Sequence, residues 1–330
     1  MKLAVRPLEL GANRALGGRW VEVHHAAHRA LFGPRSQRTD LATVLATPVR
    51  RGEEWHCFAG YAGERLVGAG AAITSTQDNR HVGNQWLSVH PDFQRRGLGS
   101  MLLERIETDL AERGCTQLLT HAGEPDPEGC GPTAFALARG FRQTHLSLRL
   151  TLDLTLWRPQ PGEPGGDPAA YEILTAADQL PEEWLEDRAY LARRMSTDAP
   201  LGEVDLDEED WDADRLRERW SSRHRVRNFE AVARDRESGR LVGYTDLTWN
   251  PASPWLFVQT DTLVLREHRG RGLGGALKVA NLLAACKLVP EADTVETWNS
   301  ESNDAMLTLN RRLGFTVSGW TRDWFKTLPR

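Results

Sequence analysis

The apolar residues of this 330-residue chain follow two kinds of pattern, and segments of the two kinds alternate along the sequence. Short apolar runs bounded by glycine or polar turns are typical of strands, and longer stretches with apolar residues three and four positions apart are typical of helices. In the first half they predict strands at residues 3–8, 55–61, 66–74, 86–89 and 116–120, helices within 13–50, at 100–113 and at 133–139, and two closing strands up to residue 157. In the second half they predict strands at 171–174, 229–248 (a hairpin), 256–265 and 294–298, and helices at 178–194, up to 225, at 275–288 and at 303–312.

A glycine-containing corner interrupts this pattern twice. The first corner covers residues 94–99 (QRRGLG) and the second covers residues 269–274 (RGRGLG). Each corner follows an apolar run, at residues 86–89 or 262–265, and each leads into a helical pattern. Both corners are therefore predicted to join a strand to a helix.

A corner of this kind is a candidate site for a diphosphate. It exposes consecutive backbone N–H groups at the start of a helix, where they have no intrahelical acceptor and where the helix dipole favours negative charge. Glycine lets phosphate oxygens approach the backbone closely, and arginines supply fork-shaped donors. One isolated match is a weak signal, because a glycine turn with solvated arginines gives the same pattern.

The spacing of the two corners strengthens the signal, because it indicates a duplicated domain. Gly97 and Gly272 lie 175 residues apart. Two further pairs keep nearly the same offset: RLVG at 65–68 and 240–243, and Gly-Phe at 140–141 and 314–315. These landmarks predict tandem domains at residues 1–157 and 169–330, joined by a linker at 158–168 that is rich in proline and glycine.

Both halves resemble the GNAT superfamily of N-acetyltransferases, whose signature is Gln/Arg-x-x-Gly-x-Gly/Ala between the fourth strand and the third helix. The resemblance covers nearly the whole chain, and the tandem arrangement is similar to that of mycothiol synthase and other two-lobe acetyltransferases of actinobacteria. It implies an α+β fold class with two tandem lobes, each a mixed, mostly antiparallel sheet with splayed fourth and fifth strands, flanked by helices. It also implies acetyl-CoA as the acyl donor and CoA as a product.

The resemblance assigns acetyl-CoA binding to the fourth strand and the corner of each lobe. It places pantetheine between the splayed strands, paired with the backbone of Leu87, Ser88 and Val89 in the first lobe and of Leu263, Val264 and Leu265 in the second. It places the pyrophosphate at Gln94, Arg95, Arg96, Gly97, Leu98, Gly99 and Ser100, and at Arg269, Gly270, Arg271, Gly272, Leu273, Gly274 and Gly275.

Acetyl transfer to an amine also needs a base for the amine, and three carboxylates are candidates. They are Asp261 on the fourth strand, Glu296 on the fifth and Asp246 on the third. A carboxylate that loses solvent in such a place rises in pKa toward the value that a base needs near neutral pH. Each of them also fits an ordinary strand carboxylate.

The leaving thiolate needs a proton, and here the chain departs from the family pattern. Asn303 matches the asparagine that such lobes place near the pantetheine arm, but the usual tyrosine seven residues later is Asn310. An amide has no acidic proton, so that role passes to water. The first lobe has Gly129 and Ala136 at these two positions. The second lobe is therefore expected to do the chemistry, while the first binds CoA structurally or has lost turnover.

Composition and charge exclude several other classes. The net charge of −5 gives no reason to expect nucleic acid as a partner, and no apolar run is long enough to span a membrane or to serve as a signal peptide. We expect a cytoplasmic monomer or homodimer. The four cysteines lack Cys-x-x-Cys spacing, so no metal site is expected. His24 and His28 are interpreted as helix surface.

The expected function is acetyl-CoA-dependent transfer of an acetyl group to a small-molecule amine. Residues 203–214, with eight carboxylates and no basic residue, are either a solvated surface or a rim that attracts a cationic amine. A non-catalytic acyl-CoA-binding or scaffolding protein and an acetyltransferase for protein amines are the alternatives. A dinucleotide fold fits the glycines at 270, 272 and 275, but the first corner has no third glycine.

Overall fold

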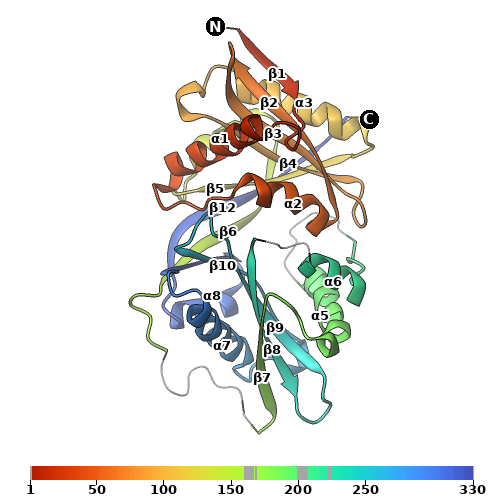
Figure 1. Ribbon diagram of the computed structural model, residues 1–330, viewed down its shortest axis with the longest axis vertical. Helices are drawn as coiled ribbons and strands as arrows, with labels where there is room; N and C mark the ends of the chain where they lie inside the picture. Colours follow the sequence, from red (N-terminus) through yellow and green to blue (C-terminus); the bar gives the residue numbers. More distant parts are fainter. Residues whose placement is uncertain (1, 160–166, 168, 199–206, 222–224, 330) are drawn as a thin grey trace. The chain divides into compact units, whose positions relative to one another are not determined.

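The computed structural model describes residues 2–159, 167, 169–198, 207–221 and 225–329. Within these residues the chain forms two compact units. The first unit consists chiefly of Met1–Leu146 and Gly319–Arg330, and the second chiefly of Ser147–Leu201 and Glu208–Ser318. Each unit is a mixed sheet with helices on both faces (Figure 1). The predicted linker at 158–168 lies largely outside the described residues.

The sheet of the first unit has the strand order β1-β2-β3-β4-β5-β12. Strands β4 and β5 run parallel, and the other neighbours run antiparallel. The strands are β1 (Leu3–Pro7), β2 (Glu53–Ala62), β3 (Arg65–Ser75), β4 (Val82–Val89), β5 (Gln117–Glu124) and β12 (Thr316–Thr327). The helices are α1 (Arg14–Phe32), α2 (Leu41–Arg51), α3 (Leu98–Glu112) and α4 (Gly131–Ala138), with a 3-10 turn η1 (Pro91–Phe93).

Alternation along β3 places α1 and α3 on opposite faces of this sheet. Ala69 and Ala71 pack in one cluster with Trp20 of α1. Gly68 faces α3 so closely that a Cβ atom there would lie 2.9 Å from Leu102. Successive strand residues point to opposite faces, and the missing side chain lets the helix approach the sheet. The helix that begins at the first corner is therefore held firmly against the sheet.

The second unit repeats this plan with the strand order β6-β11-β10-β9-β8-β7, in which β10 and β11 run parallel. The strands are β6 (Arg142–Asp153), β7 (Tyr171–Ala177), β8 (Arg227–Asp235), β9 (Leu241–Trp249), β10 (Leu256–Val264) and β11 (Thr294–Ser300). The helices are α5 (Leu185–Asp198), α6 (Ala213–Ser221), α7 (Leu273–Leu288) and α8 (Asp304–Arg312), with 3-10 turns η2 (Glu182–Trp184) and η3 (Arg266–His268). The predicted fold class is thus confirmed, and the largely antiparallel pairing excludes the dinucleotide fold.

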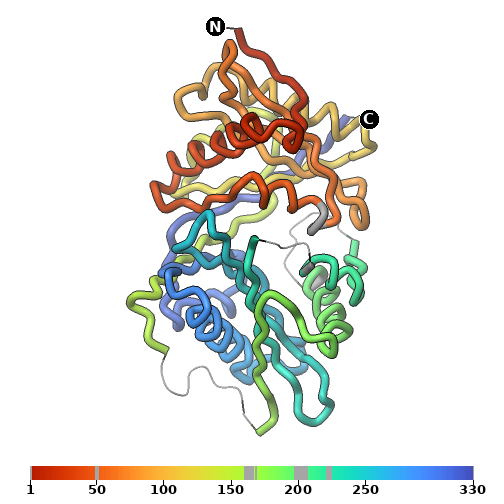
Figure 2. The backbone as a smooth tube through the Cα atoms, in the orientation of Figure 1, coloured from red at the N-terminus to blue at the C-terminus, as the bar shows by residue number. Residues whose placement is uncertain are grey.

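The two closing strands are exchanged between the halves of the sequence. Strand β12, from the C-terminal end of the chain and blue in Figure 2, pairs with β5. Strand β6, from the end of the first half, pairs with β11. The prediction of two closing strands up to residue 157 is wrong, because β6 is one continuous strand with no turn residue inside it. The compact units therefore differ from the predicted boundaries at 1–157 and 169–330.

A buried ion pair fastens β12 into the first unit. Arg322 of β12 donates to the carboxylate of Glu124 at 2.6 Å, and the two side chains are only 6% and 0% exposed. The same carboxylate accepts from the backbone N–H groups of Cys130 and Thr133 at the start of α4. Glu124 therefore joins an exchanged strand to the helix that follows β5.

Replacing Glu124 by leucine is expected to destabilise the first unit by about 3 kcal/mol, because it leaves a buried guanidinium without its counter-ion and two backbone N–H groups without their acceptor. The free energy of unfolding in urea measures this loss. Glu107→Gln is the matched control, since the Glu107–Lys326 pair is partly exposed and is expected to contribute less than about 1 kcal/mol. Equal losses in the two variants would contradict the assignment.

Candidate active site

Both glycine corners lie exposed at the start of a helix, as predicted. Gly97 precedes α3 with φ of 91°, and Gly272 precedes α7 with φ of 77°. Neither helix start receives a hydrogen bond from a capping side chain. The first backbone N–H groups of each helix consequently have no intrahelical acceptor, and the helix dipole adds to their attraction for an anion. Both corners thus suit a phosphate group.

The first residue of each corner has the same role in both halves. Gln94 donates to the carbonyl of Val89 at 3.0 Å, and Arg269 donates to the carbonyl of Val264 at 2.8 Å. Each bond ties the corner to the last residue of β4 or β10 and so holds it beside the strand end. Among the other arginines, the Arg271 guanidinium donates to the Tyr171 hydroxyl at 2.6 Å.

The fourth and fifth strands of each unit separate after a short paired stretch. Strands β4 and β5 pair from Val82 to Asn84, and β4 then continues to Val89. Strands β10 and β11 pair from Leu256 to Val258, and β10 continues to Val264. Beyond these pairs the described residues show no further pairing between the two strands, so an extended ligand can pair with the strand edges there. The predicted wedge is therefore present in both units, beside each corner.

Buried charges gather on the α5 face of the second unit. The Arg188 guanidinium of α5 donates to Glu230 of β8 at 2.7 Å and lies 3.3 Å from the ring centre of Tyr244. Asp246 of β9 is 4% exposed and accepts from the backbone N–H of Asp261 at 2.8 Å. The Tyr244 hydroxyl donates to Asp261 at 3.4 Å. Two predicted base candidates, Asp246 and Asp261, thus lie together.

Asp261 has the environment that a general base requires. It lies on the part of β10 that has separated from β11, and its side chain is partly buried. Burial raises the pKa of Asp261 to about 6, and the nearby charge of Asp246 adds to the rise. A carboxyl group with this pKa is largely ionised at pH 7 and is still basic enough to accept a proton.

Glu296, the third candidate, is engaged elsewhere. Its carboxylate forms an ion pair with Arg149 of β6, and both side chains are largely buried. Burial raises the pKa of Glu296, while the positive charge of Arg149 opposes that rise. Glu296 also lies opposite Val258, where β10 and β11 are still paired. Its position suits attachment of the exchanged strand better than proton transfer.

The two asparagines of α8 have local partners. The Asn303 side chain accepts from the Met306 N–H at 3.1 Å and so caps the helix. Asn310 is fully buried and donates to Asn299 of β11 at 2.6 Å. Neither amide is an acid, so the structure offers no proton donor at the position where the family usually has a tyrosine.

The first unit has no carboxylate at the matched positions. Asp246 pairs with Glu230 across β8 and β9, and the corresponding pair across β2 and β3 is Ala71 with Cys57. Ala71 also pairs with Trp86 of β4, which occupies the place of Asp261. The corner and the wedge are therefore retained in the first unit, whereas the group that would act as base is replaced by apolar side chains.

A buried lysine in the second unit was not found from the sequence. Lys278 of α7 is 1% exposed, and its Nζ lies 5.9 Å from the ring centre of Phe315. Burial lowers the pKa of Lys278 to about 7, and the charge of Asp246 opposes the shift. The sequence repeat could have predicted this burial, because the residue that corresponds to Lys278 in the first half, 175 positions earlier, is the core residue Leu103.

His24 was predicted to lie on a helix surface, and this was wrong. It is 5% exposed and stacks on Trp86 with ring centres 3.9 Å apart. Its Nδ1 lies 2.8 Å from the Ser88 hydroxyl. The apolar face of α1 carries it into the core beside Trp20. In the described part of the chain, no group of three or more metal-ligating side chains forms.

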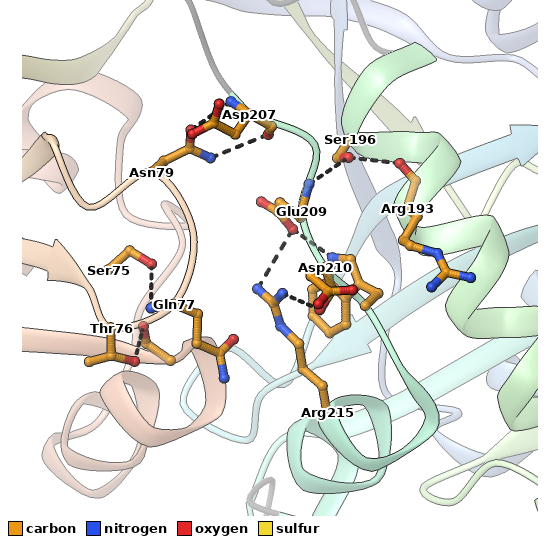
Figure 3. A network of polar contacts seen from close by, with 12 residues as sticks. Ser75, Thr76, Gln77, Asn79, Arg193, Ser196, Asp207, Glu209, Asp210 and Arg215 are labelled. Carbon is orange, nitrogen blue, oxygen red and sulfur yellow. Dashed lines mark hydrogen bonds and ion pairs between the residues drawn. The ribbon is translucent and has the colours of Figure 1, made fainter.

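The described part of the acidic stretch is tied to α5 and α6 (Figure 3). The Glu209 N–H donates to Ser196 at 3.2 Å, and its carboxylate accepts from Trp211 at 2.6 Å. The Arg215 guanidinium lies 4.0 Å from this carboxylate and 4.0 Å from the Trp211 ring centre. These partners moderate the negative charge of the stretch. Residues 203–206 lie outside the described residues.

Comparisons with known proteins agree with this geometry. The Acetyltransferase (GNAT) family matches residues 20–128 and 183–315, so the chain belongs to that family and is an acyltransferase. A tandem GNAT protein from the clavulanic acid biosynthesis pathway, solved without AcCoA, is 26% identical and superimposes with a TM-score of 0.82 over 100% of this chain and 99% of that one. This chain is thus similar to a tandem GNAT protein over its full length.

A GCN5-related N-acetyltransferase from Sphaerobacter thermophilus has the same fold, with a TM-score of 0.67 and 17% identity over 99% of this chain and 96% of that one. Among curated proteins, no match is found. None of the helices formed by the described residues is long and apolar enough to span a membrane.

Proposed function

We propose that this protein transfers the acetyl group of acetyl-CoA to the amine of a small molecule, and that the second unit does so. The observation that carries the proposal is the position of Asp261. Its carboxyl group, with a raised pKa, lies on the separated part of β10, and that strand leads into an exposed phosphate-binding corner. The first unit has a corner and a wedge but no such carboxylate.

The residues of the second unit fit acetyl-CoA in two places. The N–H groups that follow Gly272 lie at the start of α7 without a capping side chain and suit the pyrophosphate. The backbone of Leu263–Leu265 lies beyond the last pair with β11 and suits the amide groups of pantetheine. When bound, acetyl-CoA supplies a thioester, which is an activated acyl group.

Asp261 then removes the proton that the amine must lose. Tyr244 donates to this carboxylate and Asp246 holds the backbone N–H of Asp261, so the group is oriented before the substrate enters. Because Asn310 has no acidic proton, the proton for the departing thiolate comes from water. Base catalysis of this kind contributes about 10²–10⁴-fold in rate.

The buried charges favour a cationic acceptor. Glu230, Asp246 and Asp261 contribute three carboxyl groups on neighbouring strands, whereas two positive charges, Arg188 and Arg219, act on them. An ammonium or guanidinium group on the substrate is therefore attracted to this face, and the described acidic residues near Glu209 add to the attraction at longer range. We infer a small polar amine that carries positive charge before it is acetylated.

A thiol-release assay with acetyl-CoA and a panel of amines tests this function. We expect release that depends on a small cationic amine and that saturates with it. Release with a peptide amine and none with small amines would instead favour a protein substrate. Tight binding of acetyl-CoA without release for any amine would favour a non-catalytic acyl-CoA-binding protein, and it would contradict the proposal.

A further inference from the structure

The first unit contains a hydrogen-bonded histidine and serine beside its wedge. The Nδ1 atom of His24 lies 2.8 Å from the Ser88 Oγ atom. The imidazole is fixed by aromatic contacts, because it stacks on Trp86 at 3.9 Å between ring centres and meets the edge of Trp20 at 4.6 Å. The pair is therefore rigid.

The imidazole of His24 is uncharged near neutral pH. Burial among the tryptophans lowers the pKa of His24 well below its usual value, and the charges of His25 and His28 act in the same direction. Its Nε2 atom is buried and has no hydrogen-bond partner among the described residues. In the tautomer that carries its proton on Nε2, the Nδ1 atom accepts from the Ser88 hydroxyl, and a base in this position raises the nucleophilicity of that hydroxyl.

Ser88 lies where a thioester in the first wedge would be placed. Strands β4 and β5 are last paired at Asn84, and Ser88 lies four residues further along β4, where the edge is free. Its side chain is partly exposed. The residue that corresponds to Ser88 in the second half, 175 positions later, is Leu263. Of the two wedges, only the one in the first unit therefore has a serine at this position.

We propose that Ser88 is an acyl acceptor and that His24 is its base. The inference takes acetyl-CoA as the acyl donor from the proposed function, and it rests in addition on the binding of acetyl-CoA at the corner and wedge of the first unit. The Ser88 Oγ atom forms a bond to the acetyl carbon, and the bond between that carbon and the CoA sulfur breaks. The hydroxyl proton moves to Nδ1 of His24 and then to the departing sulfur. The products are an acetyl ester on Ser88 and free CoA.

The ester is expected to accumulate. A hydrolytic triad uses a carboxylate on the far nitrogen of the histidine, and here the far nitrogen Nε2 has no partner among the described residues. The first unit also lacks the carboxylates that the second unit has. One rapid release of CoA per chain, followed by little further release, is the kinetic consequence in the absence of an amine.

Intact-mass analysis and peptide mapping of the full-length protein test the inference after incubation with acetyl-CoA and no amine. We expect one acetyl group on Ser88, with a matching burst of free thiol. Ser88→Ala removes both the label and the burst, and His24→Gln lowers the burst rate about 100-fold. Ser88→Cys retains the label as a thioester, which neutral hydroxylamine cleaves, whereas the serine ester resists it.

Ser75→Ala is the matched control and keeps the label, since the Ser75 hydroxyl accepts from the Gln77 N–H in an exposed turn and lies on another strand than Ser88. An unmodified Ser88 in the wild type overturns the inference, and so does acetylation confined to lysines or the N-terminus. A separate titration of the same protein with acetyl-CoA shows whether an unmodified Ser88 is due to absent binding or to absent acetylation. If the first unit binds acetyl-CoA and Ser88 stays unmodified, this inference alone fails. If the first unit binds no acetyl-CoA, the assignment of its corner fails as well, while the proposed function of the second unit is tested separately by its turnover.

Discussion

Replacing Asp261 by asparagine is expected to lower kcat by about 100-fold or more, while the Kd for acetyl-CoA changes little. The amide retains the shape of the side chain and its contact with Tyr244, but it cannot accept a proton from the amine. Steady-state kinetics with a saturating amine, together with titration of acetyl-CoA, measure the two quantities separately.

The pH dependence of the rate provides a second test of this role. Because the pKa of Asp261 is raised to about 6, the rate of the wild type should rise with pH through about 6 and then level off as the carboxyl group ionises. Asp246→Asn removes the neighbouring negative charge, so the pKa of Asp261 falls and the rising part of the profile moves to lower pH.

Glu237→Gln serves as the control, because Glu237 is an exposed carboxylate in the β8–β9 turn and should leave kcat and the pH profile unchanged. An Asp261→Asn variant with wild-type kcat would exclude this residue as the base. Asp246, which lies on the same face, would then be the remaining candidate for the base.

Replacing Lys278 by leucine is expected to stabilise the second unit by about 3 kcal/mol at pH 6. The substitution removes a buried ammonium group, and leucine is the residue that α3 has at the matched position, Leu103. Urea unfolding, followed by tryptophan fluorescence, gives the free energy of unfolding for each variant.

The pH dependence of stability identifies the lysine as the cause. Its pKa is about 7 in the folded protein and 10.5 in the unfolded chain. Between these values the unfolded chain binds one more proton, so the stability of the wild type rises with pH from about 7 to about 10.5. Below pH 7 both states hold the proton, and the full cost of burial, up to about 5 kcal/mol, is present.

Lys278→Leu should abolish this rise, whereas Lys287→Leu, an exposed site near the end of the same helix, should retain it and alter stability by less than about 0.5 kcal/mol. A wild type whose stability is flat from pH 7 to pH 10 would show that Lys278 is not buried in charged form.

Much of the site could be predicted from the sequence because it depends on local backbone. Each corner has a glycine with positive φ directly before its helix, Gly97 or Gly272, and glycine at such a position can be recognised in the sequence. Arg95, which also has a positive φ, could not be recognised in this way. The repetition of the corners at a fixed offset then located both wedges. The carboxylates Asp246 and Asp261 were also predicted, since strand alternation places them near the wedge.

The strand exchange could not be predicted in the same way. Strands β6 and β12 follow equivalent Gly-Phe landmarks and have similar alternating patterns, so either strand suits either sheet. The observed pairing is accompanied by ion pairs between residues that are far apart in the sequence. Arg322 meets Glu124 in one sheet and Arg149 meets Glu296 in the other, and each pair joins residues more than a hundred positions apart.

The partners of buried polar residues were equally hidden. In the sequence, Arg188 is one of many arginines in a helical segment, and only the structure shows its hydrogen bond to Glu230. His24 likewise fits a helix surface in the sequence, and only the structure shows that it stacks on Trp86. Their burial follows from which face of α5 or α1 meets the sheet. That depends on packing between elements rather than on spacing within one of them.

The binding of acetyl-CoA by the two corners is tested most directly by calorimetric titration of the wild type, Gly97→Asp and Gly272→Asp. Each substitution puts a carboxylate at a corner and strains a backbone with positive φ. We expect two sites in the wild type and the loss of one in each variant, with affinity there reduced at least about tenfold, or 1.4 kcal/mol. Turnover should be lost only in Gly272→Asp. Unchanged binding in both variants would contradict the assignment of the corners.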